Sequence, residues 1–333
     1  AQGLPTLDVE AAAAPTFDQV KTLFVTTPLD RLSGKFVGQL SGRGQALVDF
    51  NMTMPLKGKP DPLVDVDANV NLDTLVLPVR KLQLTELKGR LHYRSDQGFN
   101  SESIKARVFG QPIGGLISQS GDVVRVDAQG RIPVIELARW LQQPVLGLFN
   151  GAAEMRLSLV TSGNDRGVHI QSDLQGVGMP LPSPFAKTAE APRRLQLEAP
   201  LGDGAVAITI GDNLRLDLDL QEGDVRSGGL RVGDVDSPIL ESGYFTVSGH
   251  LGRHKLEPWQ ALLSRYQSLL AANSSTAQGQ GDGLVPRVRG LVIDALSVGS
   301  FSLDEADADV DWLPGAIRVD LSARQLDGSI AIP

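Results

Sequence analysis

The chain of 333 residues is short of several residue types and patterns. It contains no cysteine, which excludes disulfide bonds and thiolate metal sites. No apolar run reaches the length of about 18 residues that a membrane-spanning helix needs. Aromatic residues are only 5% of the chain, so smaller aliphatic side chains must supply most of the buried apolar area. The net charge of −8 disfavours nucleic acid and anionic headgroups as partners, although it does not disfavour binding of acyl chains.

Motifs of catalysis are also missing from the sequence. It has no G-x-S-x-G elbow, no Walker A loop and no G-x-G-x-x-G after a strand. The four histidines are His92, His169, His250 and His254, and none lies in an H-E-x-x-H motif. We expect them at the surface. We therefore expect no enzymatic activity, no catalytic residues and no cofactor.

One acidic segment, residues 304–311, has the D-x-D-x-D spacing of a calcium loop. Such a loop needs a glycine at its sixth position and an acid at its twelfth, where this chain has Trp312 and Arg318. The acids alternate instead with alanine and valine, as on the wet face of a strand. The sequence therefore favours a strand over a metal site, and we expect no metal.

The dominant pattern that is present has a period of two residues. Strict alternation of apolar and polar side chains is typical of strands with one buried and one solvated face. The apolar positions of the clearest runs are Val48, Phe50, Met52, Met54, Val64, Val66, Val70, Leu72, Val206, Ile208, Ile210, Leu214, Leu216, Leu218, Leu220, Ile317, Val319 and Leu321. Short turns rich in Gly, Asp, Asn, Ser and Pro separate the runs, which favours antiparallel meanders over βαβ units.

Helical spacing of apolar residues predicts three helices, over residues 16–24, 133–141 and 257–271. The first begins with Thr16 and Gln19 at the spacing of a capping box. The polar segment 273–283 is expected to be a flexible loop.

An internal repeat links two of these helices to the strands before them. Gly130 precedes Trp140 by ten residues, and Gly249 precedes Trp259 by the same distance. Both tryptophans are expected to anchor a helix on the sheet. The repeat predicts one continuous body over residues 1–333, with approximate units 30–142 and 150–272 and a remainder 284–333.

A sheet with one apolar face must cover that face, and so few helices cannot cover so many strands. The sheet can pack on a second sheet, curl around its own core, or form an open groove for an apolar ligand. The small aliphatic residues suit a groove for acyl chains, but a β-sandwich accounts for the alternation equally well. The apolar positions given above are the candidates for the groove wall.

A proline-rich segment, Pro180–Lys187, lies between two strand-like runs and should cross in an extended form. It can be read as a loop at the sheet edge. Alternatively, Lys187 could contact a lipid phosphate at the rim of a groove.

Several segments together resemble the AsmA-like superfamily of Gram-negative bacteria, and most closely its YhdP type, which is related to TamB. They are the Thr26–Leu29 motif, the segment Gly176–Lys187, the Gly-to-Trp repeat, and the closing stretch Ala323–Pro333. The similarity runs along nearly the whole chain, and the order and spacing of the motifs carry it.

The resemblance implies a mainly β fold: an extended, curled antiparallel sheet that forms an open hydrophobic groove, with a few short amphipathic helices. It implies a segment of a longer periplasmic bridge anchored in the inner membrane, with membrane contact made by other parts of that chain. The implied partner is phospholipid or another acyl-chain lipid, moved passively between the inner and outer membranes to maintain the outer-membrane barrier; partner proteins of the envelope are also possible. The alternative is a structural β-sandwich spacer or protein-interaction module that transports nothing.

Overall fold

The computed structural model describes residues 6–26, 36–56, 63–78, 81–121, 123–161, 166–222, 224–274, 284–313 and 315–332. The predicted residues 275–283 of the polar loop and Thr27–Leu29 of the first family-like motif lie outside these ranges. The fold is mainly β, as expected. Packing divides the chain into unit 1, residues 1–132 and 154–167, and unit 2, residues 133–153 and 168–333. The proposed repeat units remain a prediction.

Unit 1 is an antiparallel meander, as the turn spacing predicts. Each strand from β1 to β7 pairs antiparallel with the next. These strands are β1 (Thr6–Ala13), β2 (Ser41–Pro55), β3 (Leu63–Val76), β4 (Gln83–Arg94), β5 (Gly98–Val108), β6 (Gln111–Ser120) and β7 (Val123–Pro133). Beside β7 lies the end of β8 (Asn150–Val160), where the amide of Thr161 donates to the carbonyl of Val124.

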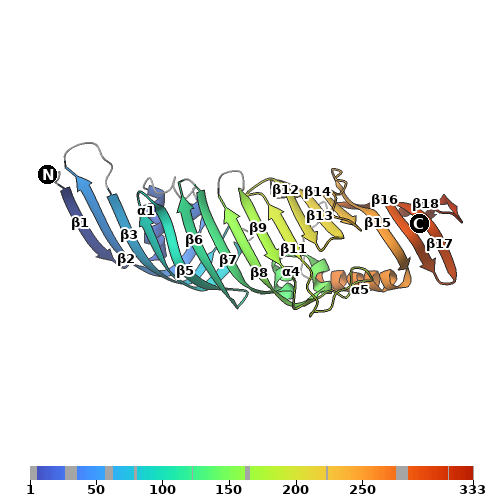
Figure 1. The fold of residues 1–333 in the computed structure, drawn as a ribbon, viewed down its shortest axis with the longest axis horizontal. Helices are drawn as coiled ribbons and strands as arrows, with labels where there is room; N and C mark the ends of the chain where they lie inside the picture. Colours follow the sequence, from blue (N-terminus) through green and yellow to red (C-terminus); the bar gives the residue numbers. More distant parts are fainter. Residues whose placement is uncertain are drawn as a thin grey trace. The chain divides into compact units, whose positions relative to one another are not determined.

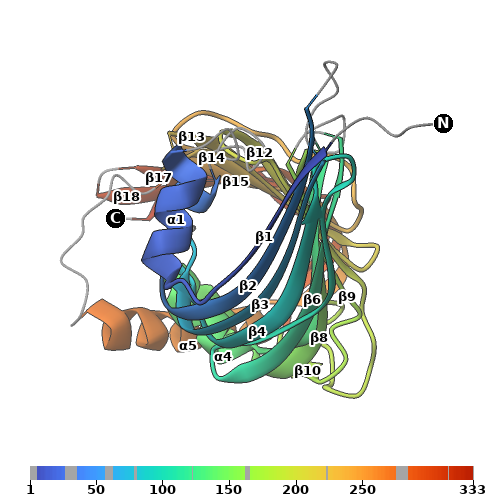
Figure 2. The same ribbon diagram turned by 90° about the vertical axis from the view of Figure 1, so that its left-hand side faces the viewer.

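The first predicted helix is α1 (Phe17–Thr26), followed by the short helix α3 (Phe36–Gln39). The capping box forms: the Thr16 amide donates to Oε1 of Gln19 at 2.9 Å, and the Gln19 amide donates to Oγ1 of Thr16 at 3.4 Å. A Cβ placed on Gly42 of β2 would lie 3.3 Å from the Phe17 ring, so α1 packs closely against that strand. Figure 2 shows α1 on the concave side of the curved strands β1 to β4.

Unit 2 contains the other two predicted helices and the remaining strands (Figure 1). Its helices are α4 (Val134–Leu141), the 3-10 helix η2 (Pro144–Leu148) and α5 (Glu257–Ser274). Its strands are β9 (Gly167–Ser172), β10 (Val177–Gly178), β11 (Leu195–Ala199), β12 (Gly204–Ile210), β13 (Leu214–Gln221), β14 (Asp224–Val232), β15 (Tyr244–Lys255), β16 (Val285–Val298), β17 (Phe301–Leu313), β18 (Ala316–Ser322) and β19 (Asp327–Ile332). The pairing order runs from β9 through β11 to β19, while β10 pairs with β8.

The expected antiparallel pairing holds for most of unit 2, but its sheet is mixed. The strand β15 pairs parallel with both β14 and β16. A parallel pair needs a connection that returns the chain to the same end of the sheet, and α5 supplies part of that return between β15 and β16. The apolar spacing predicted a helix here, but not that it would connect two parallel strands.

The second return, from β14 to β15, is made by residues 233–243, which cross the polar face of the sheet. A Cβ on Gly229 would lie 2.5 Å from the carbonyl oxygen of Ile239, so the crossing chain lies directly on β14. Asp217 on β13 is only 7% exposed and accepts a hydrogen bond from Nε of Arg215 at 3.0 Å. The face that alternation predicts to be solvated is therefore covered at this point.

Candidate functional site

The apolar residues of unit 1 lie on one face of its sheet and form rows from strand to strand. Residues paired directly across neighbouring strands point to the same face, so the register itself defines these rows. One row contains Ala11, Phe50, Val66, Tyr93 and Phe99, from β1 to β5. Another contains Ala46, Val70, Gly89, Ile104, Gly115 and Ala128, from β2 to β7.

This is the face on which α1 packs. Gly42, which α1 approaches, lies an even number of positions from Ala46 and Val48 on β2, and alternate residues of a strand point to the same face. The concave side of the curved strands in unit 1 is therefore the apolar side (Figure 2).

Unit 2 carries a longer row of the same kind. It contains Ile170, Leu197, Ile208, Leu216, Leu230, Val247, Val288, Val310, Val319 and Ile330, from β9 and then every strand from β11 to β19. The row continues through the parallel pairs without changing face. The predicted groove-wall positions on β12, β13 and β18 thus all belong to one apolar face of unit 2.

The two apolar faces differ in how much the chain itself covers them. Within the described ranges, both clusters of buried apolar side chains lie in unit 2. In unit 1 the predicted residues Val48, Phe50, Met52, Val66 and Val70 remain half-buried. In that unit, therefore, much of the face is accessible beyond the area that α1 contacts.

The cover in unit 2 is the proline-rich segment, residues 180–187, which we call the strap. Leu181 of the strap packs against both buried clusters, and Phe185 is 3% exposed within the second. The ring of Phe185 meets Trp259 edge to face, with 5.9 Å between ring centroids. Trp259 thereby anchors α5 as expected. The strap crosses the apolar face and does not lie at the sheet edge.

Three predicted groove-wall residues of unit 2 pack in the clusters beneath this cover: Ile210, Leu214 and Leu321. Leu216 and Leu218, on the same face of β13, belong to neither cluster and stay half-buried. On β13, the cluster beneath the strap thus reaches Leu214 but not Leu216 or Leu218.

Lys187, which the sequence suggested as a contact for a lipid phosphate, does not lie at an exposed rim. Its side chain is buried, at 7% exposure, and Nζ donates to the carbonyl oxygens of Leu174 at 2.8 Å, Val177 at 2.7 Å and Thr188 at 3.1 Å. Burial lowers the pKa of Lys187, and the nearby Arg193 lowers it further. All three ammonium hydrogens are used inside the loop, so this geometry assigns Lys187 to holding the strap and disfavours contact with a lipid phosphate.

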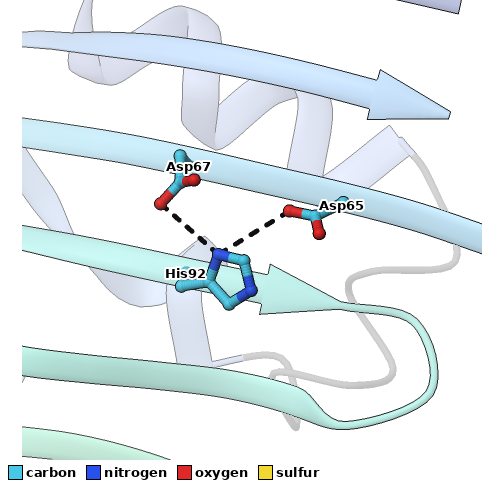
Figure 3. Close-up of side chains that lie close together, drawn as sticks. All are labelled: Asp65, Asp67 and His92. Atoms are coloured by element: carbon cyan, nitrogen blue, oxygen red, sulfur yellow. Dashed lines mark ion pairs between the residues drawn. The ribbon is translucent and has the colours of Figure 1, made fainter.

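The polar face of unit 1 carries the only cluster of possible metal ligands found among the described residues, Asp65, Asp67 and His92 (Figure 3). Nδ1 of His92 lies 3.7 Å from Asp65 and 3.3 Å from Asp67. Arg90 also lies 3.0 Å from Asp67, so this carboxylate already has a cationic partner. Neighbouring strands bring these side chains together as an ordinary polar pair in register, and we assign the cluster no further function.

The acidic run 304–311 forms the strand β17, as predicted. Asp311 accepts from Nε of Arg287 at 3.0 Å, and the hydrogen bond from Arg289 lowers the pKa of this carboxyl group. The expectation of surface histidines is wrong for His254, which is 8% exposed beside Trp259, with 6.1 Å between ring centroids. It lies at the end of β15, where α5 folds back over the strand.

Fold and surface together define a mainly β protein whose units each present a long apolar face on one side of a sheet. The chain belongs to the YhdP protein family, whose model matches residues 2–333. No curated protein and no solved structure matches it significantly. The family is associated with the cell envelope and indicates a bridge-like protein. Among the described residues, no helix is both long and apolar enough to cross a membrane.

Proposed function

We propose that this chain is a segment of a periplasmic lipid conduit, in which the acyl chains of phospholipids lie on the apolar faces of the two units. The observation that carries the proposal is the register, which joins apolar side chains into rows that cross strand after strand. Family membership supports the same reading.

The physical basis is the transfer of hydrocarbon from water to an apolar surface. Each methylene group removed from water contributes about 0.8 kcal/mol, and this attraction has no direction. Side chains that repeat along a row give successive positions similar affinity, so a lipid can move from strand to strand without a deep trap. We propose that this movement is passive and involves no catalytic group of the chain.

The alternative is a spacer or interaction module that carries no lipid. A sandwich would bury each apolar face under a second sheet. Instead, the strands of each unit pair in a single series, and helices and the strap provide the covers seen. This arrangement supports the conduit over the sandwich. An interaction module remains as the outcome to be tested.

The test compares two aspartates introduced on opposite faces of β3. Val66→Asp places a charge in the row with Phe50 and Tyr93, whereas Asn69→Asp places the same charge on the exposed polar face. An unpaired carboxylate against acyl chains should cost about 2 kcal/mol, which weakens lipid binding about thirtyfold. Lipid bound to the purified chain is measured by native mass spectrometry and by extraction with lipid analysis.

We expect the unchanged chain and Asn69→Asp to retain the same amount of phospholipid and Val66→Asp to retain less, because only the face of unit 1 is altered. Thermal unfolding by circular dichroism establishes that both variants are folded; if Val66→Asp is not, Val66→Thr places a smaller polar change at the same position. A folded, unchanged chain that carries no lipid would favour the interaction module. Equal lipid content in both folded variants would remove the apolar face of unit 1 from the proposal.

A further inference from the structure

The strap lies on the apolar face of unit 2, where backbone and side-chain hydrogen bonds hold it in place. Its ends are joined by two backbone hydrogen bonds, from the Met179 amide to the Lys187 carbonyl at 2.8 Å and from the Lys187 amide to the Met179 carbonyl at 3.0 Å. Nη1 of Arg193 donates to the Phe185 carbonyl at 2.9 Å, and Nη2 donates to the Ala186 carbonyl at 3.1 Å. With the Lys187 ammonium also bound, two cationic side chains hold this short turn in place.

On β13 and β14 the strap covers one end of the apolar face only. On β13, Leu214 packs in the cluster around Phe185, whereas Leu218 does not. These two residues lie on one face, four positions apart, which corresponds to about 13 Å along a strand. On β14, Val232, the partner of Leu214, is buried in the cluster. Gly228, the partner of Leu218, lies outside the cluster, and a Cβ placed there would lie 2.6 Å from the Phe245 ring.

We propose that the strap is the side wall of the lipid path in unit 2, confining acyl chains to the part of the face around Leu216 and Leu218. In this reading, which rests on the proposed function, Phe185 is the residue that excludes acyl chains from Leu214 and Val232. Lys187 and Arg193 are positioning residues, because they hold the strap and do not contact lipid.

The reason for a wall follows from the chemistry of the face. Alternation makes Leu214 and Leu218 equally attractive to hydrocarbon, so the strands alone set no lateral limit to an acyl chain. The apolar surface of Leu214 is already covered by the cluster that contains Phe185, together with Leu251 of β15 and Ile293 of β16. An acyl chain could enter there only by displacing a buried aromatic ring and breaking the charged hydrogen bonds of the strap.

The experiment uses the full chain and a phosphatidylethanolamine that carries a photoreactive diazirine in its acyl tail. After irradiation, tandem mass spectrometry of peptides locates the labelled residues. We expect label at Leu216 and Leu218 and several-fold less at Leu214 and Val232. The variant Phe185→Ala should raise the label at Leu214 and Val232 several-fold, and Phe185→Leu should restore most of the exclusion. Phe301→Ala, which removes a ring that is 76% exposed elsewhere in unit 2, is the matched control and should change nothing.

The outcomes separate this inference from the function on which it rests. Equal labelling of Leu214 and Leu218 in the unchanged chain would overturn the wall and leave the conduit intact. Label on neither position, or on the polar face, would overturn both. If Phe185→Ala does not fold, the variant Lys187→Met releases the strap without removing the ring, and Lys255→Met on an exposed lysine of β15 is its control. An unchanged labelling pattern in folded Lys187→Met would remove Lys187 from the proposed positioning role.

Discussion

Replacing Gly249 by alanine should destabilise unit 2 strongly, because this glycine lies where β14 and β15 approach each other. Its φ of +127° is a conformation that residues with a side chain rarely adopt. A Cβ at this position would lie 2.0 Å from the carbonyl oxygen of Val232 and 2.9 Å from its nitrogen. Both neighbours are backbone atoms of the paired strand, so they can move only if the parallel pairing itself shifts.

The magnitude follows from these two effects. Backbone strain of this kind costs about 1–3 kcal/mol, and forced repacking in a closely packed region costs about as much again. We therefore expect Gly249→Ala to lower the free energy of unfolding by about 2–6 kcal/mol. Gly130 is the matching glycine of the repeat, and Gly130→Ala should lower the free energy of unfolding by less. The φ of Gly130 lies outside the left-handed range, and the atom nearest to an added Cβ is the side-chain Cγ2 of Ile113, at 2.6 Å.

The control lies on the same strand. A Cβ on Gly252 would meet only Oδ2 of Asp294, at 3.9 Å, so Gly252→Ala should be neutral or stabilise by about 0.5 kcal/mol. Urea unfolding followed by tryptophan fluorescence measures all three variants. We expect the free energy of unfolding to fall most in Gly249→Ala, less in Gly130→Ala and least in Gly252→Ala. Equal stability of the Gly249 and Gly252 variants would refute the reasoning, since only the close approach distinguishes these two positions.

Two further predictions concern buried polar groups of β15. Burial lowers the pKa of His254 below its ordinary value of 6.5, so the unfolded chain binds a proton more readily than the folded chain as the pH falls through 6.5. The free energy of unfolding should therefore decrease as the pH is lowered from about 7.5 to about 5.5, the range in which histidine titrates. The variant His254→Phe should make this decrease smaller. An unchanged slope in the variant would exclude His254 as its source. The hydroxyl group of Thr246 is fully buried, at 0% exposure, with no hydrogen-bond partner, so Thr246→Val should raise the free energy of unfolding by about 1 kcal/mol in urea denaturation, whereas a loss of that size would contradict the assignment.

Alternation in the sequence predicted the strands well, because each strand faces a consistent environment along its length. Residues 64–72 and 214–220 show this clearly: their apolar positions share one face of their sheets, and the intervening acids and amides lie on the other. The capping residues of α1 were equally informative, since a capping box involves only neighbouring residues. Such local signals require no knowledge of the tertiary fold.

The crossings could not be predicted in the same way, because they depend on contacts between distant segments. Nothing in the pattern of β15 and β16 distinguishes parallel from antiparallel pairing. One signal was available: Gly228 and Gly229 stand together inside β14, and glycine within a strand often marks the close approach of another segment. A Cβ on Gly229 would indeed collide with the crossing residues Pro238 and Ile239.

The candidate groove wall was predicted as a face but not as an accessible surface, and the reason is physical. Leu214 and Leu218 occupy equivalent places in one alternating run, yet Leu214 packs against the buried cluster that contains Phe185 and Leu218 does not. Alternation reports that water is excluded from a face, and it gives the same signal whether protein or lipid excludes it. In unit 2 the strap covers one part of that face, whereas in unit 1 the described residues form no comparable buried cluster. If acyl chains occupy both faces, unit 1 should therefore accept them over a larger part of its strands than unit 2, although the two sequences alternate alike.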